Sequence, residues 1–249
     1  MIGNKKVVCV IPARLAATRF PQKMLSSLLG KPLLQWVWQA AHTNNCFDEI
    51  IFAVDAQETA QLISSFGGKF MMTSVSCESG TDRLVELHAS GKVQADIWVN
   101  WQGDEPFITS SMIQDLLQSC QSDTADMWTL RKKIENEEEI NSPHFAKVVC
   151  DNVGHARYFS RSAIPFYREP VMTEKIYYKH VGIYAFTQQA LSKIAQMQPS
   201  FLEGAEKLEQ LRFLQNNLSI RVHETKQEVI GIDRPEDLAR AELFVQRSV

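Results

Sequence analysis

Short apolar runs and longer amphipathic segments alternate along the first 120 residues of the chain. The apolar runs predict strands at residues 7–11, 50–54, 69–72 and 97–100. Segments in which apolar residues recur every three or four positions predict helices at residues 33–42, 58–66, 82–88 and 111–119. Regular alternation of strands and helices is typical of βαβ units, which build a mostly parallel sheet covered on both faces. The first half of the chain is therefore predicted to be a doubly wound α/β layer.

The regular alternation of apolar runs and amphipathic segments ends at about residue 122. Polar or proline-containing segments separate strand-like pieces at residues 126–130, 146–150, 157–160 and 182–186. Helical periodicity returns at residues 191–197, 203–214 and 235–245, with a strand at 220–223. We interpret the acidic residues 135–139 as a solvated segment rather than a metal site. The pattern predicts one compact unit over residues 1–249, with a smaller inserted antiparallel lobe at about residues 123–190.

Composition and net charge exclude several classes of protein. The net charge of −3 over 249 residues argues against a general nucleic-acid binder, which would be basic over a whole face. No apolar run approaches the ~18 residues that a membrane span needs, and the N-terminus lacks the apolar core of a signal peptide. The five cysteines lie at least 30 residues apart without a CxxC pair. This spacing is typical of reduced thiols and argues against a zinc site. We expect a cytoplasmic protein that binds neither nucleic acid nor membrane.

Positive charge gathers in the loop after the first predicted strand. Pro12 is expected to stop that strand because it has no N–H to donate. The loop then carries Arg14, Arg19 and Lys23, and residues 1–47 hold six Lys or Arg and no Asp or Glu. Open α/β sheets bind ligands at the carboxyl ends of their strands, so we expect an anion here, in particular a polyphosphate. A solvated basic loop is the alternative. Neither GxxxxGK[ST] nor GxGxxG is present, so side chains must hold the anion.

Two aspartates are candidate metal ligands. Asp104 follows the strand predicted at residues 97–100, and a carboxylate that faces a polyphosphate needs a divalent cation between them. The alternative for Asp104 is a turn or a helix cap. Asp233 precedes a helix opened by Pro235, and its local sequence favours a cap over a metal ligand.

Eight motifs in the same order resemble the 3-deoxy-manno-octulosonate cytidylyltransferases, also called CMP-Kdo synthetases, over nearly the whole chain. The matching residues are 10–14 (VIPAR), 18–21, 23, 72–74, 79–83 (SGTDR), 102–106 (QGDEP), 158–161, 164–165, 180–184 (HVGIY), 208–212 (LEQLR), 233 and 235–238. The resemblance implies a Mg²⁺-dependent nucleotidyltransferase that transfers CMP from CTP to Kdo and releases pyrophosphate, for lipopolysaccharide biosynthesis. It also implies a Rossmann-like, three-layer α/β fold, a lobe that serves sugar binding or dimerisation, and a homodimer.

The resemblance also assigns roles to individual residues. The CTP-binding residues would be Arg14, Lys23, Ser79, Gly80 and Arg83, of which Arg14 and Lys23 also serve catalysis. Asp104 and Asp233 become catalytic Mg²⁺ ligands, against the local preference for a cap at Asp233. The sugar-binding residues would be Arg19, Gln102, Arg161, His180, Tyr184, Glu209 and Gln210. Of these, Arg161 has independent support because Arg binds carboxylates bidentately and Kdo is a keto acid. The alternative for His180 is a structural histidine.

Three residues of the first loop depart from the family pattern. Ala17 stands where Ser is usual, Gln22 where Gly is usual and Met24 where Pro is usual. The cations remain, so we expect altered CTP affinity rather than lost activity. The alternative functions are a cytidylyltransferase for another sugar acid, such as sialic acid or amino-Kdo, and a non-catalytic nucleotide-binding regulator.

Overall fold

The computed structural model describes residues 2–15, 20, 22–169, 175–228, 231–232 and 234–248. The chain divides into two compact units, one of Met1–Ile113 with Glu228–Val249 and the other of Gln114–Gln227. The lobe predicted at about residues 123–190 falls inside the second unit, which is larger than predicted. A single domain over the whole chain stays a prediction. No described helix has both the length and the apolar character required to span a membrane.

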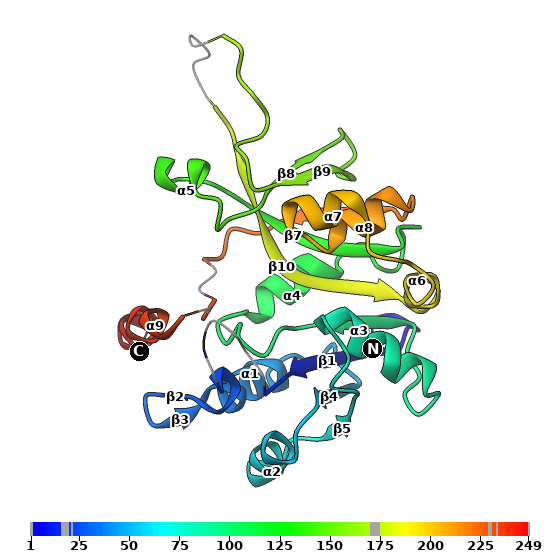
Figure 1. Cartoon of the computed structure of the whole chain (residues 1–249), viewed down its shortest axis with the longest axis vertical. Helices are drawn as coiled ribbons and strands as arrows, with labels where there is room; N and C mark the ends of the chain where they lie inside the picture. The colour runs from blue at the N-terminus through cyan, green and yellow to red at the C-terminus, as the bar shows by residue number, and fades with distance from the viewer. Residues whose placement is uncertain are drawn as a thin grey trace. The chain divides into compact units, whose positions relative to one another are not determined.

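A parallel sheet forms the centre of the first unit (Figure 1). Its strands lie in the order β6 (Ile97–Asn100), β1 (Val7–Ala13), β4 (Glu49–Val54) and β5 (Phe70–Met72). The helices of this unit are α1 (Leu33–His42), α2 (Gln57–Ser65), α3 (Gly80–Ala89) and α9 (Pro235–Ser248), with the short helix η1 (Lys23–Leu25) and the hairpin β2 (Ser27–Leu28) and β3 (Lys31–Pro32). Helix α4 (Ser110–Leu117) spans the boundary between the units. The predicted α/β alternation is confirmed, because every residue of β1 is buried between two parallel neighbours.

The prediction that Pro12 stops the first strand is wrong. Strand β1 runs on to Ala13, with Pro12 opposite Ala53 of β4. Val10 accepts a hydrogen bond from the N–H of Trp101, so even-numbered residues of β1 direct their N and O atoms toward β6. Pairing with β6 ends at Val10. An N–H at position 12 would point toward β6, where hydrogen bonding has already ended, so its absence costs no hydrogen bond. The hydrogen bonds between β1 and β4 come from the odd-numbered residues of β1 and are unaffected.

The second unit is mixed and largely antiparallel. Its strands are β7 (Met127–Lys133), β8 (Lys147–Cys150), β9 (Ala156–Ser160), β10 (Tyr178–Thr187) and β11 (Ile220–Glu224). Its helices are α5 (Glu137–Asn141), α6 (Gln188–Ile194), α7 (Phe201–Glu206) and α8 (Gln210–Gln215). Strand β10 pairs antiparallel with β7 and β8, and β8 pairs antiparallel with β9, whereas β11 pairs parallel with β7. The predicted antiparallel character is confirmed for this unit.

One continuous helix at residues 203–214 was expected, and this expectation is wrong. Helix α7 ends at Glu206, the next residue Lys207 has the left-handed φ of 54° and ψ of 47°, and α8 begins at Gln210. Arg161 donates from Nε to the carbonyl of Glu206 at 2.7 Å and from Nη2 to that of Lys207 at 3.2 Å. A side chain from β9's end thus satisfies carbonyls that a continuous helix would have bonded internally.

Acid should destabilise the second unit through His223. Its Nε2 lies 2.8 Å from Oγ of Ser119, and burial, aided by the charge of Arg221, lowers the pKa of His223 to about 4. An unfolded histidine titrates near pH ~6.5. Between these pKa values the unfolded chain binds a proton that the folded protein does not, so stability falls as pH falls. We expect the free energy of unfolding, measured with urea, to fall less steeply across this window in His223→Gln. An equal slope in both proteins would contradict this expectation.

Candidate active site

Lys23 and Asp104 meet at the carboxyl end of the parallel sheet. Lys23 lies in η1, after β1, and Asp104 lies just beyond β6, the strand beside β1. The ammonium of Lys23 donates to Oδ2 of Asp104 at 2.5 Å, with 8% of the Lys23 side chain and 25% of the Asp104 side chain exposed. A cation predicted for the phosphates and a predicted metal ligand are thus direct neighbours.

Close backbone packing places Asp104. A Cβ added to the preceding residue, Gly103, would lie 2.9 Å from the carbonyl oxygen of Pro12 and 3.0 Å from Cδ2 of Leu34. Since real side chains do not approach backbone oxygen that closely, only glycine allows this turn. The turn therefore holds the Asp104 carboxylate against the loop after β1.

The segment before residue 233 also lies on this turn. The N–H of Ile232 donates to the carbonyl oxygen of Asp104 at 3.0 Å. A Cβ added to Gly231 would lie 2.8 Å from Oε1 of Glu105. Asp233, the second predicted metal ligand, lies outside the described residues, as does Arg19. The sequence neighbour of Asp233 is thus hydrogen-bonded to Asp104, and the pairing of the two aspartates stays a prediction.

The Asp104 carboxylate fits a magnesium ion held jointly with phosphate. Its oxygen already has a cationic partner, and part of the side chain is open to solvent. Among the residues that the structure describes, no three His, Cys, Asp or Glu side chains converge to form an all-protein metal cage. Mg²⁺ ordinarily takes only one or two carboxylates and fills its other positions with water and phosphate oxygens. The role of Asp104 as a Mg²⁺ ligand stays a prediction.

The carboxyl end of the parallel sheet also carries three of the predicted CTP-binding residues, Arg14, Ser79 and Gly80. Arg14 is exposed, and its Nη1 donates to the carbonyl of Glu78 at 3.4 Å. Ser79 caps helix α3 through a capping box, in which Ser79 Oγ accepts from the N–H of Asp82. A Cβ added to Gly80 would lie 3.0 Å from the side-chain amide of Gln102, another predicted site residue. The N-terminus of α3 thus begins beside the turn at residues 102–104.

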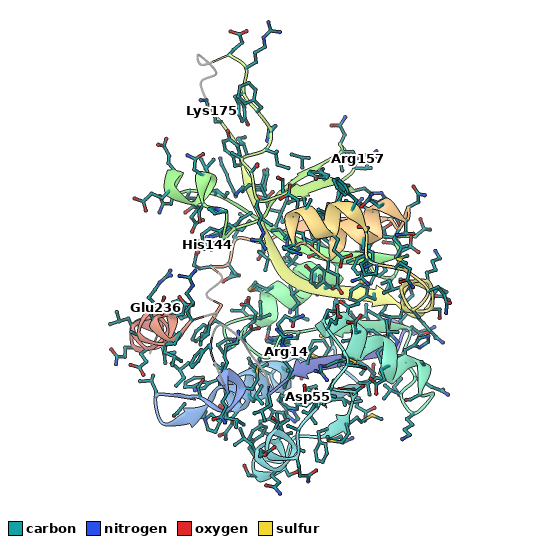
Figure 2. All side chains as sticks on the ribbon, viewed as in Figure 1. Arg14, Asp55, His144, Arg157, Lys175 and Glu236 are labelled. Atoms are coloured by element: carbon teal, nitrogen blue, oxygen red, sulfur yellow. The ribbon has the colours of Figure 1, made fainter. Side chains whose placement is uncertain are left out.

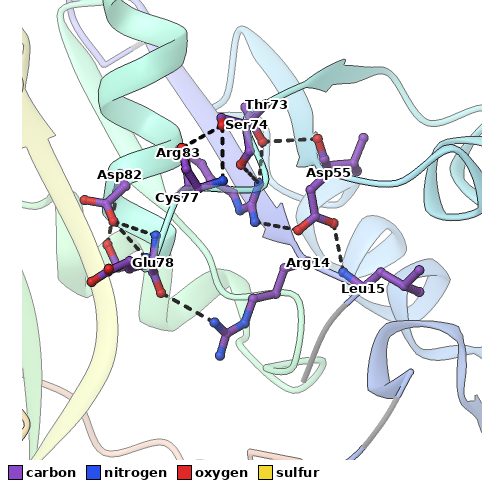
Figure 3. Close-up of polar contacts among 12 residues, drawn as sticks. Arg14, Leu15, Asp55, Thr73, Ser74, Cys77, Glu78, Asp82 and Arg83 are labelled. Atoms are coloured by element: carbon purple, nitrogen blue, oxygen red, sulfur yellow. Dashed lines mark hydrogen bonds and ion pairs between the residues drawn. The ribbon is translucent and has the colours of Figure 1, made fainter. Parts of the chain in front are cut away.

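Arg83 is buried, and its guanidinium already has several partners. It is 1% exposed, and it bonds Asp55, Thr73 and Ser74 (Figure 3). Direct contact of Arg83 with the nucleotide stays a prediction. Sequence reasoning missed Asp55, although an aspartate directly after a buried parallel strand is a signal that could have identified it. Arg14 and Asp55 both lie in the first unit (Figure 2).

One residue of the first loop has a backbone conformation that agrees with the family pattern. Gln22 has a φ of 53° and a ψ of 27°, a left-handed conformation that favours glycine. Glycine is what the resemblance expects at this position. Ala17, the residue expected to be Ser, lies outside the described residues.

Three predicted sugar-side residues meet within the second unit. The hydroxyl of Tyr184 lies 3.5 Å from Oε1 of Gln210, and Nε2 of Gln210 lies 3.5 Å from Nδ1 of His180. Tyr184 and His180 come from β10, and Gln210 begins α8. Burial, together with the charge of Glu209, raises the pKa of Tyr184 well above its ordinary value, so its hydroxyl stays protonated. These side chains form one polar cluster between a strand and a helix.

His180 is neutral, and its tautomer follows from its neighbour. Burial lowers the pKa of His180 to about 3. Oγ1 of Thr129 lies 2.8 Å from the carbonyl of Ile183 and 2.9 Å from Nε2 of His180. A hydroxyl has one proton, which goes to the carbonyl, so His180 must donate from Nε2. Nδ1 is then an acceptor, and the side-chain amide nitrogen of Gln210 lies 3.5 Å from it.

Arg161 contacts three backbone carbonyls. Besides its bonds to Glu206 and Lys207, its Nη1 donates to the carbonyl of Pro143 at 2.7 Å. These bonds hold the turn that leads into α8 and therefore the helix start at Gln210. The direct bond from Arg161 to a sugar carboxylate stays a prediction.

A model of the cytidylyltransferase family matches residues 8–220. The 3-deoxy-manno-octulosonate cytidylyltransferase of Geobacter metallireducens is 43% identical over 243 residues, which cover 94% of this chain and 95% of that protein. The protein of the same name from Acaryochloris marina is 39% identical and covers 98% of both chains.

Solved structures agree in fold. A structure of CMP:2-keto-3-deoxy-manno-octonic acid synthetase complexed with CTP has a TM-score of 0.92 and 39% identity, and the match covers 98% of this chain and all of that one. The 4-diphosphocytidyl-2C-methyl-D-erythritol synthase of Anaerococcus prevotii has a TM-score of 0.62 at 12% identity, with 98% of this chain and 99% of that chain covered. The second likeness concerns the fold alone.

Proposed function

Since the chain belongs to the 3-deoxy-manno-octulosonate cytidylyltransferase family, we propose that it transfers CMP from CTP to Kdo. The observation that carries this proposal is the match over 98% of the chain, at 39% identity, to a synthetase structure that contains CTP. The ion pair of Lys23 with Asp104 supports it, because the resemblance assigns Lys23 to the phosphates of CTP and Asp104 to the Mg²⁺.

The proposed chemistry is a direct displacement at the α-phosphorus of CTP. The oxygen of the anomeric hydroxyl of Kdo forms the new O–P bond and its proton passes to water. The bond between the α-phosphorus and the oxygen that bridges to the β-phosphate breaks, and pyrophosphate leaves with the electron pair. Arg14 and Lys23 stabilise the negative charge of the leaving group. Asp104 and Asp233 would hold Mg²⁺, which supplies Lewis-acid stabilisation of phosphate charge when bound. No enzyme nucleophile is required.

The sugar acid is proposed to bind the polar cluster of the second unit. A sugar hydroxyl replaces the amide of Gln210 as the donor to Nδ1 of His180, and that amide is then available to donate to the sugar and to accept from it. Tyr184 donates through its protonated hydroxyl. Glu209 supplies an acceptor at the start of α8. The remaining proposed sugar contacts are Arg19, Gln102 and Arg161.

Pyrophosphate release tests the proposed function directly. The protein is incubated with CTP and Mg²⁺ in three parallel reactions, with Kdo, with sialic acid and without sugar. We expect release with Kdo alone. Release with sialic acid but not Kdo would assign a different sugar acid, and CTP binding without any release would indicate a non-catalytic nucleotide binder.

We further propose a homodimer in the cytoplasm that supplies lipopolysaccharide biosynthesis. None of the five cysteines, all of which lie in the described part of the chain, forms a disulfide, which suits a reducing compartment. The homodimer follows from the resemblance to the family. The pathway follows from the proposed product, an activated form of a sugar found in lipopolysaccharide.

A further inference from the structure

Asp55 joins the loop after β1 to helix α3. Oδ1 of Asp55 accepts from the N–H of Leu15 at 2.9 Å, and Oδ2 accepts from Nη2 of Arg83 at 2.8 Å (Figure 3). The register explains the first contact, because Ala13 lies opposite Val54 and the two strands therefore end side by side. Both carboxylate oxygens of a single side chain thus bind groups from distant parts of the sequence.

Arg83 extends this connection to the end of β5. Its Nη1 donates to Oγ1 of Thr73 at 2.6 Å and to the carbonyl of Ser74 at 3.2 Å. The Thr73 hydroxyl in turn donates to the carbonyl of Val54 at 3.1 Å. The carboxyl ends of β1, β4 and β5 are therefore tied together around one guanidinium.

Both side chains of the ion pair are buried from water. The Arg83 side chain is 2% exposed and that of Asp55 is 9% exposed. Such a guanidinium needs its counterion, because a buried charge that loses its partner is strongly unfavourable. A change that removes the charge of Asp55 is therefore transmitted to Arg83 and to the segments that Arg83 holds.

Arg14 lies where the connected segments meet. Leu15, whose N–H binds Asp55, directly follows Arg14 in the chain, and Nη1 of Arg14 donates to the carbonyl of Glu78. Glu78 precedes Ser79, the cap of α3. The loop after β1 and the start of α3 are thus joined twice, once through Arg14 and once through the buried ion pair.

We propose that Asp55 and Arg83 are positioning residues for CTP. Their ion pair fixes the backbone at Leu15, and with it Arg14, relative to the Ser79 end of α3. The pair therefore controls nucleotide affinity through the backbone segments that it holds in place. This inference rests on the proposed function, since it takes CTP as the ligand of these segments.

The test uses Asp55→Asn, which keeps the shape and an oxygen for the Leu15 N–H but removes the charge that faces Arg83. CTP binding is measured by calorimetry without sugar, together with the KM values for both substrates. We expect CTP binding to weaken by about 10- to 100-fold, as for a displaced binding group. The KM for Kdo should stay unchanged. Adding Arg83→Met to Asp55→Asn should cost little more affinity, because residues that act as one unit are not additive.

Asp126→Asn is the matched control. Like Asp55, Asp126 accepts from a cationic side chain, that of Lys193 at 2.7 Å, and from a distant backbone N–H, that of Ser219 at 2.9 Å. None of these three is a predicted site residue, so CTP affinity should not change. Arg83→Lys provides a second variant should Asp55→Asn not fold, and it should also weaken CTP binding.

A purely structural pair would give a different result. Asp55→Asn would then lower the melting temperature while the folded protein bound CTP within about twofold of the unmodified chain, and this outcome would overturn the proposal. Failure of the proposed function is separate: the unmodified chain would bind CTP but release no pyrophosphate with Kdo. The binding comparison between variants would still decide the role of the pair.

Discussion

Asp104→Ala is expected to lower pyrophosphate release by about 10²–10³-fold, the usual effect of removing a preorganised charge partner. The substitution removes the proposed Mg²⁺ ligand at the end of β6. It also deprives the Lys23 ammonium of the carboxylate that it binds at 2.5 Å. Steady-state turnover with CTP, Kdo and Mg²⁺ is the measurement.

A second readout separates the metal role from a general loss of structure. In the absence of Mg²⁺, the carboxylate of Asp104 repels the triphosphate, and it binds the ammonium of Lys23 that phosphate oxygens would otherwise use. Asp104→Ala should therefore bind CTP at least as tightly as the unmodified chain in metal-free buffer. Weaker metal-free binding would contradict this account of Asp104.

Asp96→Ala is the matched control for Asp104. Asp96 directly precedes β6, whereas Asp104 follows it, and its carboxylate accepts from the N–H of Lys6 at 2.7 Å. The amino end of a parallel strand lies opposite the ligand-binding edge, so Asp96→Ala should retain turnover within about twofold. Normal turnover of Asp104→Ala beside this control would refute the metal assignment.

Regular elements of the first unit follow from hydrophobic pattern. Strand β6 and helix α1 lie at residues 97–100 and 33–42, the positions that the pattern predicts. Burial on one face or both leaves a period in the sequence that local reading detects. Once parallel strands are assigned, their carboxyl ends must share one edge, and this is why the sequence alone places Lys23 and Asp104 at the same edge.

Features that depend on contacts between distant residues escape the pattern. The break at Lys207 requires a left-handed residue and a guanidinium from Arg161, which is 46 positions away in sequence. The helical periodicity of residues 203–214 contains neither signal. Pro12 was misread for a related reason, since its effect depends on which neighbouring strand its nitrogen faces.

The candidate site shows the same division. Residues such as Arg14 and Asp104 can be selected from charge and position after a predicted strand. Asp55 has the same position after β4, but its importance comes from Arg83, 28 positions further on. A buried ion pair leaves no periodic trace, so only the folded structure reveals it.

Lys147→Met is expected to cost the largest share of stability. Lys147 is fully buried, and its ammonium donates to the carbonyls of Ser142, Phe145 and Arg161 at 2.9, 2.7 and 2.6 Å. Methionine matches the length of the side chain but donates nothing, so three carbonyls lose their donor at once. Burial, together with the charge of Arg161, lowers the pKa of Lys147, because both disfavour the charged ammonium. Removing the buried charge therefore offsets part of the stability that is lost with the three hydrogen bonds.

At about 1–3 kcal/mol for each unsatisfied carbonyl, less the relief of the buried charge, we expect a net loss of about 3 kcal/mol. For a chain of this size the melting temperature should fall by about 6–12 °C, measured by thermal denaturation. Lys69→Met is the control, because Lys69 is 74% exposed and its 3.4 Å pair with Glu49 lies at the surface. The control should shift the free energy of unfolding by less than about 0.5 kcal/mol.

A Lys147→Met protein as stable as this control would contradict the prediction, because the three carbonyls would then be hydrogen-bonded to water instead. Because Arg161 holds the turn before α8, a real loss at Lys147 should also raise the KM for Kdo.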